Sequence, residues 1–422
     1  MYWILSIIPS VLLLLLFIVI HSVYGSWLIP SAFFALYWGS LLVLVLVLFP
    51  FMDMWPPAVW LILAAASVFH IGVVTVVPKN HELTNNSDDC REYGIYCGKQ
   101  IIILSFLAGI ASVLVLVHYI GYPVYSLLNP KLIIEIGLRY ASRRYGLGLG
   151  TPLFSNLLNV FLYLGAIYGG MWLVLAPKKE KYWSFGPLFI GLLQAFLVNA
   201  RTNFIWMLAF FISGYLVASI FAGHELPLFS KQHVISVAIL IVGFVFLYFV
   251  LQIFRESGGS GRHFSKTVVS MLTPPFLFSV WLKQHWGVMT PALGVKTFGG
   301  LADLLGLSHR QPGLGWEGMS VVYRSILFKP NVYTAFRQII EDTTLLGVLP
   351  FFLVLGIVSG MSYHKIKQGK SSWIPILILF YAVTLGSYLA NMLNYNTILF
   401  AWLLFVFLVS FGKWRCGKPY RR

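Results

Sequence analysis

The charged residues of this chain are confined to the segments between its apolar runs. All Lys, Arg, Asp and Glu residues lie outside about eleven such runs. Most of the runs are long enough to cross a bilayer, which takes roughly 20 residues in a helix. Only 10% of the residues are charged, whereas a soluble domain has roughly 25%. The sequence therefore predicts an all-α, polytopic integral membrane protein, because a helix satisfies every backbone hydrogen bond within one apolar segment.

The apolar runs define the predicted spans. The first run begins at Trp3, with no basic segment before it and no small-residue cleavage site after it. We therefore interpret it as a transmembrane helix and not as a signal peptide. The pair Pro56-Pro57 is typical of a helix start. Within a single transmembrane domain over 1–422, we predict helices at 3–23, 27–49, 55–77, 101–121, 153–175, 184–199, 203–222, 234–253, 343–360, 373–390 and 395–411.

Three short basic segments predict the orientation of the chain, because Lys and Arg are enriched in cytoplasmic loops. The C-terminal tail from Lys413 carries five cationic residues and no acid, and the segments 365–370 and 178–181 carry three lysines each. An even number of predicted helices separates these segments. All three are therefore expected in the cytoplasm, together with the C-terminus.

The same count assigns a side to the remaining loops. It places segments 122–152, 199–203 and 254–342 outside the cytoplasm, along with the N-terminus, and segment 78–100 inside. Cys90 and Cys97 share that last segment. They could form a disulfide in an extracytoplasmic loop, so the predicted orientation favours free thiols. No Cys/His spacing typical of zinc sites is present, and we expect no metal and no cofactor.

Segment 122–152 departs from this charge rule. It carries Lys131, Arg139, Arg143 and Arg144 against the single acid Glu135, although it is predicted to lie outside. Its apolar residues recur at near-helical spacing, with Arg139 and Arg143 one turn apart. Either the count of spans is wrong or these cations serve a purpose outside. We predict a short amphipathic helix at the membrane face.

Arginines gather in the segments predicted to be extracytoplasmic. Besides the cations of 122–152, they are Arg201 and, in the large loop 254–342, Arg255, Arg262, Arg310, Arg324 and Arg337. The planar guanidinium binds phosphate oxygens in a bidentate manner, so a membrane-anchored diphosphate is the first ligand to consider. Two alternatives stay open. Arg201 sits in a tight turn where it could snorkel to the headgroups, and Arg143 and Arg144 could contact anionic lipid without specificity.

The net charge of +16 does not indicate a nucleic-acid-binding protein. Lys and Arg fix the topology of a membrane protein and contact anionic lipid, which accounts for a basic balance. Nothing in the sequence resembles a nucleic-acid-binding module, so nucleic acid is not an expected partner.

Three stretches together resemble the Wzy-type O-antigen polymerases, which join oligosaccharide repeat units. The first reads Asn-Val-Tyr-Thr-Ala-Phe-Arg over 331–337 and is followed by Glu341, Asp342 and Gly347 before an apolar helix. The second is Asn-Ala-Arg-Thr over 199–202, and the third runs from Gly-Tyr-Pro at 121–123 to Arg-Arg-Tyr at 143–145. The resemblance covers most of the chain in topology and short patches in residues.

This resemblance implies a fold, an activity and a location. Such polymerases are similar to GT-C glycosyltransferases and act at the periplasmic face of the bacterial inner membrane. They transfer a growing glycan from undecaprenyl diphosphate to the free sugar of an incoming lipid-linked repeat unit, and undecaprenyl diphosphate leaves. Neither a nucleotide sugar nor a divalent metal is implied. The implied partners are the lipid-linked glycans, membrane lipid and a protein that regulates chain length.

The chemistry of that reaction assigns roles to named residues. Arginine can stabilise the charge that develops on the leaving diphosphate without a metal. The candidates for this role are Arg337, Arg201, Arg143, Arg144 and Arg139. The attacking hydroxyl needs a proton acceptor, for which the candidates are Asp342, Glu341, Glu317 and His309. Tyr333 and Asn331, inside the motif, are the candidates for binding sugar.

Two observations bear on competing interpretations. An acid before a helix also favours the helix dipole, so Asp342 has a structural alternative. The sequence reads Asp-Thr-Thr over 342–344, where relatives commonly have Asp-Phe-Gly. An O-antigen ligase is one alternative function, although ligases carry a histidine beside the position of Asn331, where this chain has Pro330. A flippase for the lipid-linked unit is another, but the spans contain no charged residue and no repeat is visible.

Overall fold

The computed structural model describes residues 2–50, 53–78, 88–146, 150–198, 201–224, 226, 272–287, 289–308, 321–323, 326–328 and 332–416. Only the backbone is described for 88–97, 144–146, 201, 321–323, 326–328 and 411–416. The predicted span at 234–253 lies outside the described residues.

The chain forms two compact units, here called unit 1 and unit 2. Unit 1 comprises Met1–Ser87, Ser270–His309 and Gly318–Asn396, and unit 2 comprises Asp88–Val269, Arg310–Glu317 and Thr397–Arg422. Each unit draws on distant parts of the sequence, so each depends on non-local packing.

Unit 1 is built mainly from helices. Its elements are α1 (Tyr2–Tyr24), α2 (Pro30–Leu48), α3 (Pro56–Val74), α11 (Pro274–His285), α12 (Gly299–Leu304), β1 (Val321–Tyr323), β2 (Ile326–Phe328), α13 (Ala335–Lys367), η3 (Ser371–Trp373), α14 (Ile374–Gly386) and η4 (Met392–Asn394). Strands β1 and β2 pair antiparallel, with Val322 opposite Leu327. Helix α3 begins at Pro56, as the sequence predicts, because proline tolerates the first helical turn.

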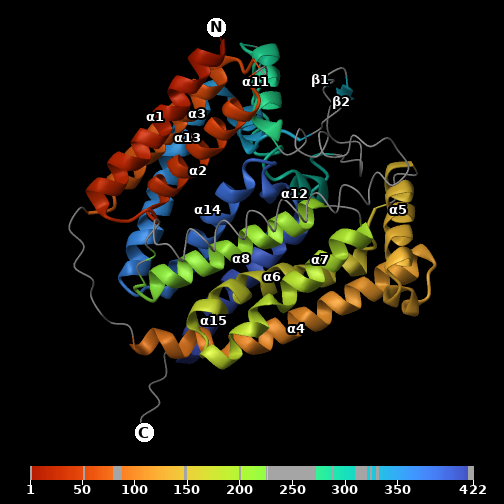
Figure 1. The fold of residues 1–422 in the computed structure, drawn as a ribbon. Helices are drawn as coiled ribbons and strands as arrows, with labels where there is room; N and C mark the ends of the chain where they lie inside the picture. The colour runs from red at the N-terminus through yellow and green to blue at the C-terminus, as the bar shows by residue number, and fades with distance from the viewer. Residues whose placement is uncertain are drawn as a thin grey trace. The chain divides into compact units, whose positions relative to one another are not determined.

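Unit 2 holds the remaining helices. Its elements are α4 (Asp88–Ile120), η1 (Val124–Leu128), α5 (Pro130–Gly146), α6 (Leu153–Leu175), η2 (Lys178–Phe185), α7 (Gly186–Val198), α8 (Arg201–Phe221) and, apart from its first residue, α15 (Asn396–Cys416). Helices α4, α6, α7 and α8 lie side by side (Figure 1).

Seven of the described helices are long and apolar enough to cross a membrane. They are Tyr2–Tyr24, Pro30–Leu48, Pro56–Val74, Gly98–Ile120, Leu153–Leu175, Thr202–Phe221 and Ala335–Lys367. Two shorter apolar segments are Ser371–Gly386 and Asn396–Ser410. The helical, polytopic character of the chain is therefore confirmed, whereas the count of eleven spans stays a prediction. Helix α7 has 13 residues, fewer than the roughly 20 that a straight span needs.

Helices α3 and α13 run parallel and touch through glycine. A Cβ atom added at Gly72 would overlap the carbonyl oxygen of Leu353, and one added at Gly356 would overlap the carbonyl oxygen of Phe69. Gly360 likewise lies against Val73 and Val76 further along both helices. Small residues of this kind let two backbones approach closely, which is how helices associate in lipid.

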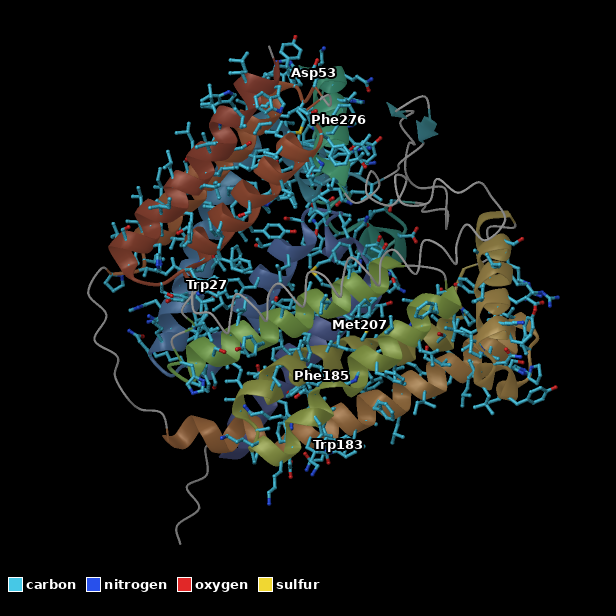
Figure 2. The ribbon with its side chains drawn as sticks, viewed as in Figure 1. Trp27, Asp53, Trp183, Phe185, Met207 and Phe276 are labelled. Atoms are coloured by element: carbon cyan, nitrogen blue, oxygen red, sulfur yellow. The ribbon has the colours of Figure 1, made fainter. Side chains whose placement is uncertain are left out.

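The remaining contacts of unit 1 define its two ends. At one end, the hydroxyl of Ser6 donates to the Met54 carbonyl at 3.1 Å, and Trp55 packs edge-on against Trp286 at 4.9 Å. The starts of α1 and α3 and helix α11 lie there, and Arg337 in the first segment of α13 contacts α11 through Trp281. Lys367 ends α13 at the opposite end, because α13 runs parallel to α3. Figure 2 shows Asp53 and Phe276 near each other at the first end and Trp27 far from them. This arrangement agrees with the predicted separation of the N-terminus from segment 365–370.

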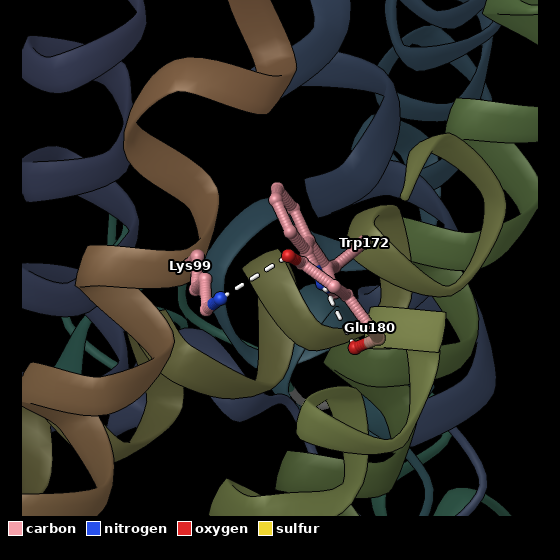
Figure 3. A network of polar contacts seen from close by, with 3 residues as sticks. All are labelled: Lys99, Trp172 and Glu180. Atoms are coloured by element: carbon pink, nitrogen blue, oxygen red, sulfur yellow. Dashed lines mark hydrogen bonds and ion pairs between the residues drawn. The ribbon is translucent and has the colours of Figure 1, made fainter. Parts of the chain in front are cut away.

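Unit 2 also has two distinct ends. Lys99 forms a 3.2 Å ion pair with Glu180, and the Trp172 indole donates to the Glu180 carbonyl at 3.3 Å (Figure 3). The start of the apolar part of α4 and the turn η2 therefore share one end, as the basic-loop pattern predicts. At the opposite end, Gly137 of α5 lies against the carbonyl oxygen of Phe196 near the end of α7. The side of the membrane that each end faces stays a prediction.

The glycine contact between α3 and α13 predicts the effect of a larger side chain. We expect Gly356→Leu to destabilise the protein by about 1–3 kcal/mol, because the new side chain must displace the backbone of α3. The melting temperature of the detergent-solubilised protein measures this loss. Val354→Leu is the matched control, since Val354 is exposed on the same helix. Equal melting temperatures for the two variants would contradict the close contact.

Candidate functional site

Helix α13 is broken near its start. Thr344 has φ 62° and ψ 177°, which no residue within a regular helix adopts. The break divides a short segment over 335–343 from the long apolar segment over 345–367. The sequence predicted a helix from residue 343 with its polar motif in the preceding loop. The predicted start lies close to the start of the long segment, but the motif before it is not a loop, because Arg337, Glu341 and Asp342 lie on helical backbone.

Arg337 is the central side chain of the first segment. It is 8% exposed, and its Nε donates to Glu341 Oε1 at 2.9 Å, one helical turn away. The centre of its guanidinium lies 4.3 Å from the ring centroid of Tyr333 and 5.1 Å from that of Trp281. Burying a charge is costly unless it is paired. The carboxylate and the two aromatic rings together offset that cost.

Aromatic packing fixes the position of Trp281. This residue of α11 stacks on Phe278 at 6.4 Å, and Phe278 contacts Phe336 of α13 at 5.8 Å. Phe336 in turn packs against Trp38 of α2 at 5.1 Å. Arg337 therefore rests on a chain of buried rings from three helices, so its guanidinium has little freedom to move.

Tyr333 is one of the two rings that hold Arg337. Its side chain is 4% exposed, and the guanidinium covers its ring. In this conformation the ring supports the arginine and is not presented to a sugar. The sugar-binding role of Tyr333 therefore stays a prediction. The structure gives its ring a second role, which is to support the Arg337 guanidinium.

Asp342 anchors a neighbouring loop. Its Oδ1 accepts the backbone N–H of Lys296 at 2.9 Å, and its Oδ2 accepts that of Thr297 at 2.6 Å. The carbonyl oxygens of Glu341 and Asp342 accept the N–H groups of Ala292 and Leu293 at 2.9 and 3.2 Å. We call these four hydrogen bonds the latch. Asp342 ends the short segment instead of starting the apolar helix, so the helix-dipole alternative does not describe it.

Backbone strain accompanies the latch on both sides. Leu293, at φ 50°, and Thr344, at φ 62°, are the non-glycine residues with positive φ in the described part of the chain. Leu293 belongs to the latch itself, and Thr344 follows two residues after Asp342. Such a conformation persists only where surrounding contacts hold it, and it is concentrated at functional sites.

Two candidate arginines of unit 2 have defined contacts. Arg139 lies over the ring of Tyr122, 5.5 Å from its centroid, and Arg143 Nη1 donates to the carbonyl oxygen of Tyr119 at 3.0 Å. Both side chains belong to α5, so the predicted amphipathic helix over this region is confirmed as a helix. Arg144 lies on α5 and Arg201 begins α8, each with only its backbone described.

The candidate residues divide between the two units. Arg337, Glu341, Asp342 and Tyr333 come together in unit 1, whereas Arg139, Arg143, Arg144 and Arg201 belong to unit 2. A single diphosphate site that joins both groups stays a prediction. Asn331, Glu317 and His309 lie outside the described residues.

Sequence reasoning did not select Trp281 or the latch. No local sequence signal links Trp281 to Arg337, because the two residues lie on separate helices. The latch joins segments 292–297 and 341–342, and its partners on one side are backbone N–H groups of ordinary residues. Among the described residues, no three His, Cys, Asp or Glu side chains are grouped so that they could hold a metal ion.

No family model, no curated protein and no solved structure matches this chain. The motif over 331–342 and the contacts of its described side chains are therefore the features that bear on function.

The latch predicts a local effect of removing one charge. We expect Asp342→Asn to weaken the loop 292–298 by about 1–3 kcal/mol, because the amide presents N–H donors where a backbone N–H needs an acceptor. Hydrogen–deuterium exchange of the loop should become faster, while exchange in α3 stays unchanged. Asp303→Asn, at an exposed position of α12, is the control. Unchanged exchange of the loop in Asp342→Asn would show that the Asp342 carboxylate does not hold the loop in place.

Proposed function

We propose that this chain polymerises oligosaccharide repeat units carried on undecaprenyl diphosphate, at the extracytoplasmic face of the bacterial inner membrane. The observation that supports this proposal is the setting of Arg337. It is a buried guanidinium held between Tyr333 and Trp281, beside Glu341, at the end of unit 1 opposite Lys367. A rigid cation at that depth suits a diphosphate whose lipid chain remains in the bilayer.

The proposed reaction is a glycosyl transfer with a lipid diphosphate as leaving group. A sugar hydroxyl of the incoming unit attacks the anomeric carbon of the growing glycan, and a new C–O bond forms. The bond from that carbon to the diphosphate oxygen breaks, and its electron pair leaves with undecaprenyl diphosphate. The hydroxyl proton passes to a carboxylate. Family analogy implies inversion at the anomeric carbon.

Arg337 is assigned to the leaving group. Charge develops on the diphosphate as the glycosidic bond breaks, and a pre-positioned guanidinium stabilises that charge without reorganisation. Its aromatic supports keep the side chain in place before the substrate arrives. Arg201, Arg143, Arg144 and Arg139 remain further candidates for the same ligand.

Glu341 is the preferred proton acceptor among the described acids. Its side chain is 20% exposed and contacts Arg337, whereas both carboxylate oxygens of Asp342 already hold backbone N–H groups. A carboxylate that anchors a loop cannot easily also take a proton from substrate. We therefore assign Asp342 to positioning and Glu341 to proton transfer, with Glu317 and His309 as the other candidates.

The proposed topology is consistent with this assignment of roles. It comprises eleven spans similar to those of GT-C glycosyltransferases, with the C-terminus in the cytoplasm. The apolar helices of both units and the opposite locations of Arg337 and Lys367 in unit 1 support it. A chain-length regulator is the proposed protein partner.

The test is the surface-glycan ladder of cells that lack this gene. We expect the ladder to collapse to a single-repeat band and the wild-type gene to restore it. Loss of the single-repeat band as well would instead point to ligation or export, and a normal ladder would reject all three functions.

Arg337→Ala should fail to restore the ladder at unchanged protein level in the membrane. Loss of one preorganised charge-stabilising group typically costs about 100- to 1,000-fold in rate. Arg337→Lys should restore it poorly, because an ammonium lacks the bidentate fork. Lys296→Ala is the control: this exposed cation of the same unit offers only its backbone N–H to the latch. A full ladder with Arg337→Ala would remove this arginine from the site.

The ring beneath Arg337 gives a separate prediction. Tyr333→Phe keeps an aromatic face under the guanidinium and should retain most polymer. Tyr333→Leu removes that face and about 1–2 kcal/mol of cation–π stabilisation, so the ladder should shorten. Gel densitometry at matched protein level compares the two variants, and equal ladders would show that the ring has no part in holding Arg337.

A further inference from the structure

Helix α5 lies in a segment whose two ends are fixed at one membrane face. The spanning part of α4 ends at Ile120, and Gly121, with φ 89°, turns the chain out of the helix. The next spanning helix, α6, begins at Leu153. Since both neighbours cross the membrane, everything from 121 to 152 starts and finishes at the same face.

One side of α5 fastens it to unit 2. Ile136 and Tyr140 are buried, and Gly137 lies against the carbonyl oxygen of Phe196. The Tyr140 hydroxyl also lies 2.6 Å from Oγ1 of Thr151, just before α6. These contacts fix which side of α5 faces away from the helices.

The other side of α5 is basic. Lys131, Glu135 and Arg139 are exposed at one-turn spacing, and the Glu135 carboxylate accepts the Tyr122 hydroxyl at 2.6 Å. Arg143, further along, donates to the carbonyl oxygen of Tyr119. Among the described side chains of α5, three cations therefore stand against one acid, Glu135, which already accepts a hydrogen bond.

Two contacts give the depth of these cations. Tyr119 belongs to the last turn of the span Gly98–Ile120, and Tyr122 follows directly after it. Arg143 bonds to the first of these residues and Arg139 covers the ring of the second. Both guanidinium groups therefore lie level with the end of a membrane span, which is the depth of lipid headgroups.

Apolar side chains border the cations at the same level. Val124, Tyr125 and Leu128 of η1 are 54%, 72% and 87% exposed, although they directly follow the end of the span. Exposed aliphatic and aromatic side chains beside cations are typical of a segment that rests in the bilayer interface.

We propose that η1 and α5 form a binding surface for the headgroups of anionic phospholipids, such as phosphatidylglycerol, in the surrounding bilayer. The cations attract the headgroup phosphates, and Tyr125 and Leu128 enter the adjacent interface. Each cation near an anionic leaflet adds roughly fivefold to binding. This surface is distinct from Arg337, and the proposal does not depend on the polymerase function.

The test measures which lipid lies beside η1 in the full-length protein. Leu128→Cys, in a chain whose Cys90, Cys97 and Cys416 are replaced by serine, carries a bimane fluorophore. The protein is placed in nanodiscs that contain spin-labelled phosphatidylglycerol or spin-labelled phosphatidylcholine at the same mole fraction. We expect phosphatidylglycerol to quench about two- to fivefold more strongly, and the excess to shrink at high salt because screening weakens surface electrostatics.

Variants separate surface charge from a specific phosphate site. Lys131→Gln/Arg139→Gln/Arg143→Gln should abolish the preference, and Lys131→Gln/Arg139→Gln, which keeps the Arg143 bond to α4, should reduce it. Arg139→Lys/Arg143→Lys should retain it, because attraction to a charged surface does not need the guanidinium fork.

Three results would overturn the proposal. The first is equal quenching by the two lipids when the surface is unmodified. The second is stronger quenching by phosphatidylglycerol that persists in the triple glutamine variant. The third is loss of that stronger quenching in the double lysine variant. The last would indicate a bidentate phosphate site instead of a lipid surface.

Discussion

Hydrocarbon offers no hydrogen-bond partner to a peptide group, and the organisation of this chain depends on that constraint. The seven long apolar helices satisfy most of their backbone groups internally. Where α13 is broken at Thr344, the carbonyl groups of Glu341 and Asp342 accept N–H groups of another segment instead. Irregular backbone is instead found near their ends, as at Gly121 and in the loop 292–298. The charged groups follow the same division, so the chemistry of the protein is concentrated where the spans end.

Arg337 shows how a charge is accommodated at such a position. A single carboxylate, Glu341, supplies a paired hydrogen bond, and the faces of Tyr333 and Trp281 supply the rest of its surroundings. The pair lies within one turn of one helix, whereas the rings come from the preceding loop and from α11. The spacing of Arg337 and Glu341 in the sequence thus determines their ion pair, and the tertiary fold determines how the guanidinium is oriented against the two rings.

The sequence predicted the spans far better than the site. Runs such as 3–23 and 153–175 correspond closely to α1 and α6, because apolarity over this length permits only a buried or membrane helix. The predicted span at 343 begins close to the break at Thr344, but the helix over 335–343 before it was not predicted, since the polar motif does not reveal that it is helical. The motif did identify Arg337, Glu341 and Tyr333 as candidates for one site, and the three side chains are in contact. The contribution of Trp281 and the partners of Asp342 depend on contacts between distant segments, which hydropathy cannot report.

The close contact between α3 and α13 has a consequence for biosynthesis. Gly72 is translated early, and its partner Gly356 belongs to the last part of the chain, with most of unit 2 in between. The glycine face of α3 therefore meets lipid, or a transient neighbour, throughout the synthesis of the middle segments. The loop 292–298 likewise has no latch until Asp342 has been made. The contact between α3 and α13 forms only after α13 has been made, and α14 and η4 of unit 1 follow later still. A ribosome that stops before residue 335 therefore releases a chain whose α3 lacks its permanent partner.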